Sequence, residues 1–181
     1  MKFKKSPTKG NLIIELEPGN TRLINQINGP ITALKELLVP VDFSDCSKYA
    51  LRYALAFAKQ FEANITLLSV VPDDSTSFEY QSPEYAELVE ARKTRYASEL
   101  KKLSATLGKV KCKNFVRVGK PFQEIVLAAK ELDSDLILIS THGQMSMPKV
   151  ELGSTAERVV RHAPCPVLVV RQKERSFAPP V

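Results

Sequence analysis

The sequence predicts an α/β fold in which five parallel strands form an open sheet with helices on both faces. Three observations lead to this prediction. Strand-like and helix-like segments alternate strictly between residues 36 and 171. The strand-like segments are short, continuous apolar runs, which is typical of parallel strands buried on both faces. The helix-like segments repeat apolar residues at intervals of three and four, as helices that pack on a sheet do.

The length and composition indicate one domain with appendages. A chain of 181 residues can bury one substantial core, and its 44% hydrophobic and 25% charged residues are typical of a globular protein. We expect an N-terminal leader at residues 1–35, the domain at residues 36–171 and a C-terminal tail at residues 172–181. The leader holds one apolar run, Leu12–Leu16, among prolines and glycines, so it predicts a loop or one edge strand.

The domain opens with a strand, a helix and a second strand. The continuous apolar run Leu37–Val41 predicts the first buried strand. Ser44 can serve as the N-cap of a helix that extends to about Phe61 with apolar residues at helical spacing. The segment Asn64–Val71 is rich in strand-forming residues and is followed by a proline, so it predicts the second strand.

The remaining segments continue the alternation. Proline is well tolerated at the first helical position, so Gly119-Lys120-Pro121 indicates a turn into a helix. The expected elements are a long helix from Tyr85 to Leu107, a strand at Cys112–Val118, a helix from Pro121 to Leu132, a strand at Leu136–Ile139, a helix from Ser154 to Arg161 and a strand at Pro166–Val170.

The charge and hydropathy patterns argue against two classes of partner. Residues 1–10 carry +4 and residues 171–175 carry +2, which together account for the net charge of +6. A nucleic-acid partner is not expected, because such proteins gather their cations on a folded face. No run approaches the roughly 18 apolar residues of a membrane span, and no signal-peptide core follows the lysine-rich start. We therefore expect a cytoplasmic protein without a membrane partner.

The cysteines and histidines give little support for catalysis or metal binding. Cys46, Cys112 and Cys165 lie far apart and lack the spacing of zinc ligands or of a disulfide framework. Cys46, near the start of a predicted helix, is the one candidate for a reactive thiol. His142 and His162 are paired with no obvious nucleophile. We expect no catalytic residue and no metal site built from the protein alone.

The topology itself points to a ligand site. In an open parallel sheet, ligands bind beyond the carboxyl ends of the strands, where the connections change direction. Three segments reach that edge: Pro40–Asp42, Ser69–Val71 and the glycine-containing stretch between Ser140 and Thr155. Asp42 could accept a hydrogen bond from an adenine amino group or a ribose hydroxyl, or share a metal ion with phosphates. Its alternative role is to cap the following helix.

The glycine-containing stretch is a candidate phosphate cradle. Gly153, Ser154 and Thr155 open a helix, and backbone N–H groups at a helix N-terminus favour an anion. Alternatively, Ser154 and Glu157 form a capping box and Gly143 serves only a turn. The GxxxxGK[ST] and GxGxxG nucleotide motifs are absent from the sequence, so efficient phosphoryl transfer is not expected.

Three segments resemble the universal stress protein domain, in the same order. They are Leu37–Ser44 (LLVPVDFS), Leu136–Gly143 (LILISTHG) and Gly153–Val170 (GSTAERVVRHAPCPVLVV), and the resemblance covers residues 36–171. It implies a Rossmann-like sheet of strand order 3-2-1-4-5. It also implies a homodimer and a bound adenine nucleotide, ATP or a relative, with or without Mg2+, held by a G-x-x-G-x9-G-[ST] loop.

The residue roles follow from this resemblance. The loop reads Ser140-x-x-Gly143-x9-Gly153-Ser154, so Ser140 replaces the first glycine. His142 lies within this loop, where it would shape the loop or contact a ribose. The resemblance assigns Pro40, Val41 and Asp42 to adenine and ribose, Val70 to the adenine face, and Gly143, Gly153, Ser154 and Thr155 to the phosphates.

The sequence therefore predicts an adenine-nucleotide-binding stress-response or signalling module with little or no catalytic activity. The alternative is a dimeric interaction protein whose nucleotide site has degenerated, and a nucleotide-dependent enzyme ranks third. The uncharged run Pro166–Val170 at the predicted sheet edge suggests a homodimer through this strand. The competing cover for that edge is the leader's Leu12–Leu16 run.

Overall fold

The computed structural model of the chain describes residues 2–5, 12–15, 34–73, 83–143 and 152–171, and it divides into two compact units, Met1–Ala33 and Leu34–Val181. In the first unit, β1 (Lys2–Lys5) pairs antiparallel with β2 (Leu12–Glu15) in a two-stranded sheet of its own. The sequence predicted that the leader with its apolar run Leu12–Leu16 is loop or one edge strand. In the structure, Leu12–Glu15 is a strand, and it pairs with Lys2–Lys5.

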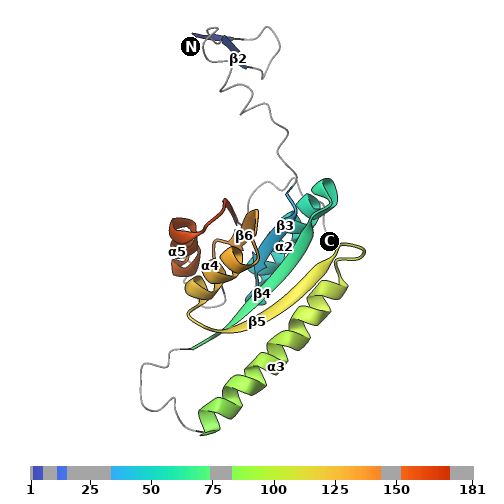
Figure 1. Cartoon of the computed structure of the whole chain (residues 1–181), viewed down its shortest axis with the longest axis vertical. Helices are drawn as coiled ribbons and strands as arrows, with labels where there is room; N and C mark the ends of the chain where they lie inside the picture. Colours follow the sequence, from blue (N-terminus) through green and yellow to red (C-terminus); the bar gives the residue numbers. More distant parts are fainter. Residues whose placement is uncertain (1, 6–11, 16–33, 74–82, 144–151, 172–181) are drawn as a thin grey trace. The chain divides into compact units, whose positions relative to one another are not determined.

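The second unit contains the predicted parallel sheet (Figure 1). Its strand order is β5-β4-β3-β6-β7, and every neighbouring pair is parallel. Counted within the domain this is the order 3-2-1-4-5, which confirms the predicted fold class. The strands are β3 (Glu36–Pro40), β4 (Asn64–Pro72), β5 (Cys112–Gly119), β6 (Leu136–Ser140) and β7 (Val167–Val170).

The helices between these strands begin and end near the predicted residues. Ser44 is the N-cap of the first one, and its side chain accepts a hydrogen bond from the backbone N–H of Ser47, as the sequence predicted. None of the described helices is long and apolar enough to cross a membrane. The helices are α2 (Asp45–Phe61), α3 (Pro83–Ala105), α4 (Pro121–Glu131) and α5 (Ser154–His162).

The core lies in two layers, one on each face of the sheet. Successive strand residues point to opposite faces, so Leu37 and Val39 pack with α2 and α3, whereas Leu38 packs with α4 and α5. Figure 1 shows α3 running alongside β5, and α4 and α5 beside each other. Because both faces are covered, the buried residues of the central strands are mostly apolar, with Thr66, Ser69 and Ser140 as buried polar exceptions, and the strand backbones are shielded from water.

The chain changes direction at β3, which lies between β4 and β6. From β3 the chain enters α2 on one face of the sheet, whereas from β6 it enters α5 on the other face. The two connections therefore leave neighbouring strand ends in opposite directions. Such a divergence opens a crevice at the carboxyl edge of the sheet.

Candidate functional site

A cavity of about 350 Å³ lies at the carboxyl ends of β3, β4 and β6. Its size falls within the range of about 300–1,000 Å³ that is usual for small-molecule pockets. Segments far apart in the chain converge on it. Ser69 and Val71, from one of the predicted edge segments, are buried and do not line it. The residues that were predicted to contact the nucleotide do line this cavity: Pro40, Val41, Asp42, Val70, Ser140, His142, Gly143, Gly153, Ser154 and Thr155.

One wall of the cavity is apolar. Leu68 is the register partner of Pro40, and the backbone N–H of Val41 donates to the carbonyl of Leu68 at 2.8 Å. These contacts hold the ends of β3 and β4 together. Val70 and Ile139 add further apolar surface from the two strands that flank β3. Such a surface suits a flat, weakly polar group such as a base.

The Asp42 carboxylate connects this wall to the start of α2. Its Oδ1 accepts hydrogen bonds from the backbone N–H of Ser44 at 3.1 Å and from the Ser44 hydroxyl at 2.6 Å. Its Oδ2 lies toward Gly143, where an added β-carbon would approach it to 2.6 Å. Asp42 is thus not the N-cap itself but orients Ser44, which is. The same half-buried carboxylate also lines the cavity.

The turn between Asp42 and Ser44 is strained. Phe43 has a φ of 66°, in the left-handed region that a bulky residue rarely adopts. Its ring meets that of Tyr96 edge to face, with centroids 5.1 Å apart. Tyr96 lies on α3 and itself lines the cavity. This aromatic contact holds the turn in place and brings α3 to the site.

The loop after β6 is tied together at its two ends. The Ser140 hydroxyl donates to the carbonyl of His142 at 2.9 Å, and the Thr141 hydroxyl lies 2.8 Å from Nδ1 of His142. The backbone N–H of Gly153 donates to the carbonyl of Thr141 at 2.7 Å. The start of α5 is therefore held next to the end of β6. Residues 144–151 of the predicted nine-residue loop lie outside the described residues.

The N-terminus of α5 has no side-chain cap, in contrast to that of α2. Gly153 is its N-cap residue, and among the described residues the backbone N–H groups of Ser154, Thr155 and Ala156 have no acceptor. The capping-box alternative is wrong, because Glu157 does not turn back to the cap but pairs with Arg161 at 3.0 Å. Unpaired N–H groups at a helix N-terminus attract an anion.

Several lining residues were missed by the sequence analysis. Tyr96 and Ile125 lie within two of the predicted helices, and no local signal in the sequence marks them as part of a site. Their place depends on how α3 and α4 pack on the sheet. The other residues that line the cavity without having been predicted are Ser47, Leu68, Pro72, Pro121, Ile139, Thr141 and Ala156.

The remaining candidates lie elsewhere. His162 is the last residue of α5, and its Nδ1 donates to the carbonyl of Arg158 at 2.9 Å. Cys46, Cys112 and Cys165 are not joined in disulfides, and burial raises the pKa of Cys112 and Cys165. Within the described parts of the chain, no three metal-ligating side chains gather.

Comparison with known proteins identifies relatives of this domain. The sequence profile of the universal stress protein family matches residues 33–171. A universal stress protein of Methanocaldococcus jannaschii is 33% identical over 144 residues, which cover 78% of this chain and 84% of that protein. The structure of a universal stress protein from Lactobacillus plantarum superimposes with a TM-score of 0.72 at 31% identity, covering 77% of this chain and 99% of that one.

Two more distant structures share the fold and hold a nucleotide. One is a universal stress protein in complex with cAMP, with a TM-score of 0.53 and 24% identity, covering 77% of this chain and 98% of that one. The other is the universal stress protein from Archaeoglobus fulgidus in complex with dAMP, with a TM-score of 0.51 and 22% identity. The match covers 75% of this chain and 96% of that one.

Proposed function

The chain belongs to the universal stress protein family, and from that premise we propose that it is a cytoplasmic adenine-nucleotide-binding module in stress response or signalling. The observation that carries this proposal is the cavity in which the uncapped N-terminus of α5 and the Asp42 carboxylate meet one apolar wall. A nucleotide offers the matching groups: an anion, hydroxyls and a flat base.

The base and ribose would occupy the part of the cavity near β3 and β4. Val41 and Val70 offer apolar contact to an adenine face, and Asp42 offers acceptor oxygens to an amino group or to ribose hydroxyls. The complexes of two family members with cAMP and dAMP support adenine as the base.

The phosphates would bind at the start of α5. The N–H groups of Ser154 and Thr155, together with the side-chain hydroxyls of both residues, offer hydrogen bonds to phosphate oxygens. Any Mg2+ would accompany the phosphates, with Asp42 as the available carboxylate. ATP and other adenine nucleotides fit this donor set.

We propose little or no catalytic activity. The sequence lacks a phosphate-binding loop lysine. Asp42, the carboxylate among the described lining residues, already accepts two hydrogen bonds from Ser44, which favours a positioning role over that of a general base. A cytoplasmic location fits three cysteines that are not joined in disulfides, because a reducing compartment keeps thiols reduced.

The second candidate function is a dimeric interaction protein with a degenerate nucleotide site. One observation favours this candidate. Ser140 occupies the position at which the family motif has a glycine, and its hydroxyl donates a hydrogen bond to the backbone carbonyl of His142 within the loop. Dimerisation is part of both candidates. It is supported by β7, an apolar strand at the edge of the five-stranded sheet.

Native mass spectrometry of the purified full-length chain separates the two candidates. Retained AMP, ADP, ATP or a cyclic nucleotide would appear as a defined mass increment, and added adenine nucleotide should restore the increment after removal. A chain that retains no nucleotide and takes up none at millimolar concentration would favour the interaction protein. Phosphate release well above background would contradict the non-catalytic assignment.

A further inference from the structure

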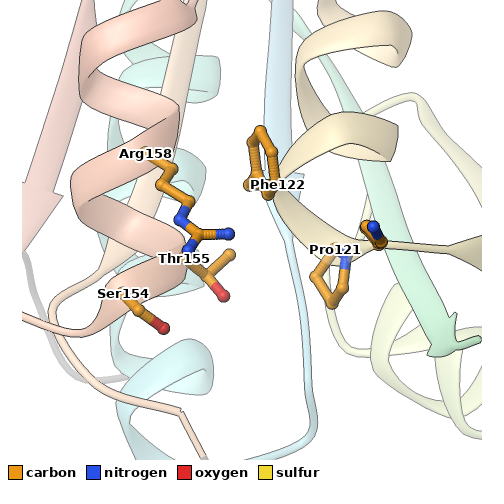
Figure 2. Close-up of a pocket in the computed structure, with 6 residues that line it drawn as sticks. Pro121, Phe122, Ser154, Thr155 and Arg158 are labelled. Atoms are coloured by element: carbon orange, nitrogen blue, oxygen red, sulfur yellow. The ribbon is translucent and has the colours of Figure 1, made fainter. Parts of the chain in front are cut away.

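A second pocket, of about 290 Å³, lies between the starts of α4 and α5 (Figure 2). Neither helix has a side-chain cap at its N-terminus. The residues that line the pocket are Lys120, Pro121, Phe122, Ser154, Thr155 and Arg158.

This pocket adjoins the nucleotide cavity. Pro121, Ser154 and Thr155 line both of them. The hydroxyls and N–H groups that would hold the first phosphate therefore also border the second space. A chain of phosphates that begins at Ser154 would therefore start at a residue that borders both spaces.

The side chains of the α4–α5 pocket favour an anion. Lys120 and Arg158 line it, and no acidic residue is among the lining residues that the structure describes. Neither cation has an ion-pair partner within the described residues. The first-turn acids of the two helices are directed elsewhere, since Glu124 pairs with Arg117 and Glu157 with Arg161. The positive charge of the pocket is thus not neutralised by the described residues.

The position of Arg158 is constrained. Its guanidinium carbon lies 5.0 Å from the centroid of the Phe122 ring. Figure 2 shows the side chain reaching from α5 toward α4, with Ser154 and Thr155 on the same helix. Stacking on a ring leaves the N–H edge of a guanidinium available for phosphate oxygens, so less side-chain entropy is lost on binding.

We propose that the α4–α5 pocket is the subsite for the distal phosphates of the nucleotide, which makes ATP and ADP better ligands than AMP and adenosine. This inference rests on the proposed nucleotide-binding function and adds the class of nucleotide to it. Lys120 and Arg158 are the residues that distinguish these ligands, because they lie beyond the groups at the start of α5 that any nucleotide monophosphate could reach.

Calorimetric titration with ATP, ADP, AMP and adenosine tests this subsite in the full chain. The double variant Lys120→Gln/Arg158→Gln should lose about tenfold or more in ATP affinity, while its AMP affinity stays within about twofold of the parent. The matched control is Lys101→Gln/Lys130→Gln, which removes two exposed cations, on α3 and α4, that lie outside the pocket and pair with no described carboxylate. This control should keep the affinities of the parent.

The outcomes distinguish a failure of the distal-phosphate subsite from a failure of the proposed nucleotide-binding function. A parent that binds AMP and ATP equally, or a double variant that keeps the ATP-to-AMP ratio of the parent, would overturn the subsite and leave the proposed function standing. A parent that binds none of the four ligands would overturn both. Inorganic tripolyphosphate that binds as tightly as ATP would also contradict the assignment, because the phosphates would then need no nucleoside.

Discussion

The carboxylate of Asp42 and the backbone of Gly143 lie so close that a β-carbon at position 143 would stand 2.6 Å from Oδ2 of Asp42. Real β-carbons do not approach an oxygen so closely. Asp42 follows β3 and Gly143 follows β6, so this contact joins the two strand ends between which the cavity opens. Gly143 is required there by lack of space and not by an unusual φ.

We expect Gly143→Ala to displace the carboxylate or the loop and to weaken adenine-nucleotide binding by about tenfold, the cost of losing one hydrogen bond to a charged group. Among the described atoms, Asp42 accounts for the close approach at this position. The same substitution in an Asp42→Ala background should therefore cost little. A double-mutant cycle by calorimetry measures this coupling, and strictly additive effects would contradict it.

Gly153→Val should weaken nucleotide binding strongly while leaving the fold intact. A branched side chain at the N-cap would block the approach of a phosphate to the unpaired N–H groups of Ser154 and Thr155. Titration calorimetry measures the affinity, and circular dichroism checks the fold. Equal affinity of variant and parent would exclude the phosphate cradle.

Asp42 has two roles that can be separated. Asp42→Ala removes the hydrogen bonds to Ser44, so we expect a loss of about 1 kcal/mol or more in the free energy of unfolding. Nucleotide affinity should fall by at most about 1.5–3 kcal/mol, less than in Gly153→Val. Asp42→Asn keeps an acceptor for Ser44 and should restore most of the stability. Unchanged adenosine binding with lowered stability would assign Asp42 to the helix start alone.

The full chain should sediment as a homodimer joined through β7. The edge strand Val167–Val170 is apolar, and pairing with a second copy would satisfy its free backbone groups. A chain beginning at Thr32 should remain dimeric, because this truncation leaves all five strands of the parallel sheet, β7 included, in place. A monomeric full chain that dimerises only after this truncation would instead indicate that the leader covers the edge.

Cys112 and Cys165 should be slow to alkylate at neutral pH. Burial raises the pKa of both thiols above the ordinary value of 9.0, so the reactive thiolate is scarce. Because the folded state favours the neutral thiol, each thiol's contribution to the free energy of unfolding is present below the ordinary pKa. That contribution is lost as the pH rises through the raised pKa. Iodoacetamide rates of variants with one remaining cysteine test this, and half-maximal rates below pH 9 would contradict it.

The sequence by itself determined the order of elements and the edge of the sheet where the site lies. Apolar runs such as Leu37–Val41 and the helical spacing after Ser44 are local signals, and strict alternation leaves few arrangements other than a parallel sheet. Once the strands are parallel, their carboxyl ends share one edge. That is why residues as distant as Asp42 and Gly153 could be assigned to one site before their distance was known.

Only the tertiary structure decided which side chains meet across elements. The left-handed turn at Phe43, its contact with Tyr96, and the pocket between Lys120 and Arg158 depend on how helices pack on the sheet. The spacing of apolar residues predicts which face of a helix or strand a residue lies on. It does not predict which other element packs against that face. The roles of such residues follow from packing, where burial and charge are set by partners distant in the chain.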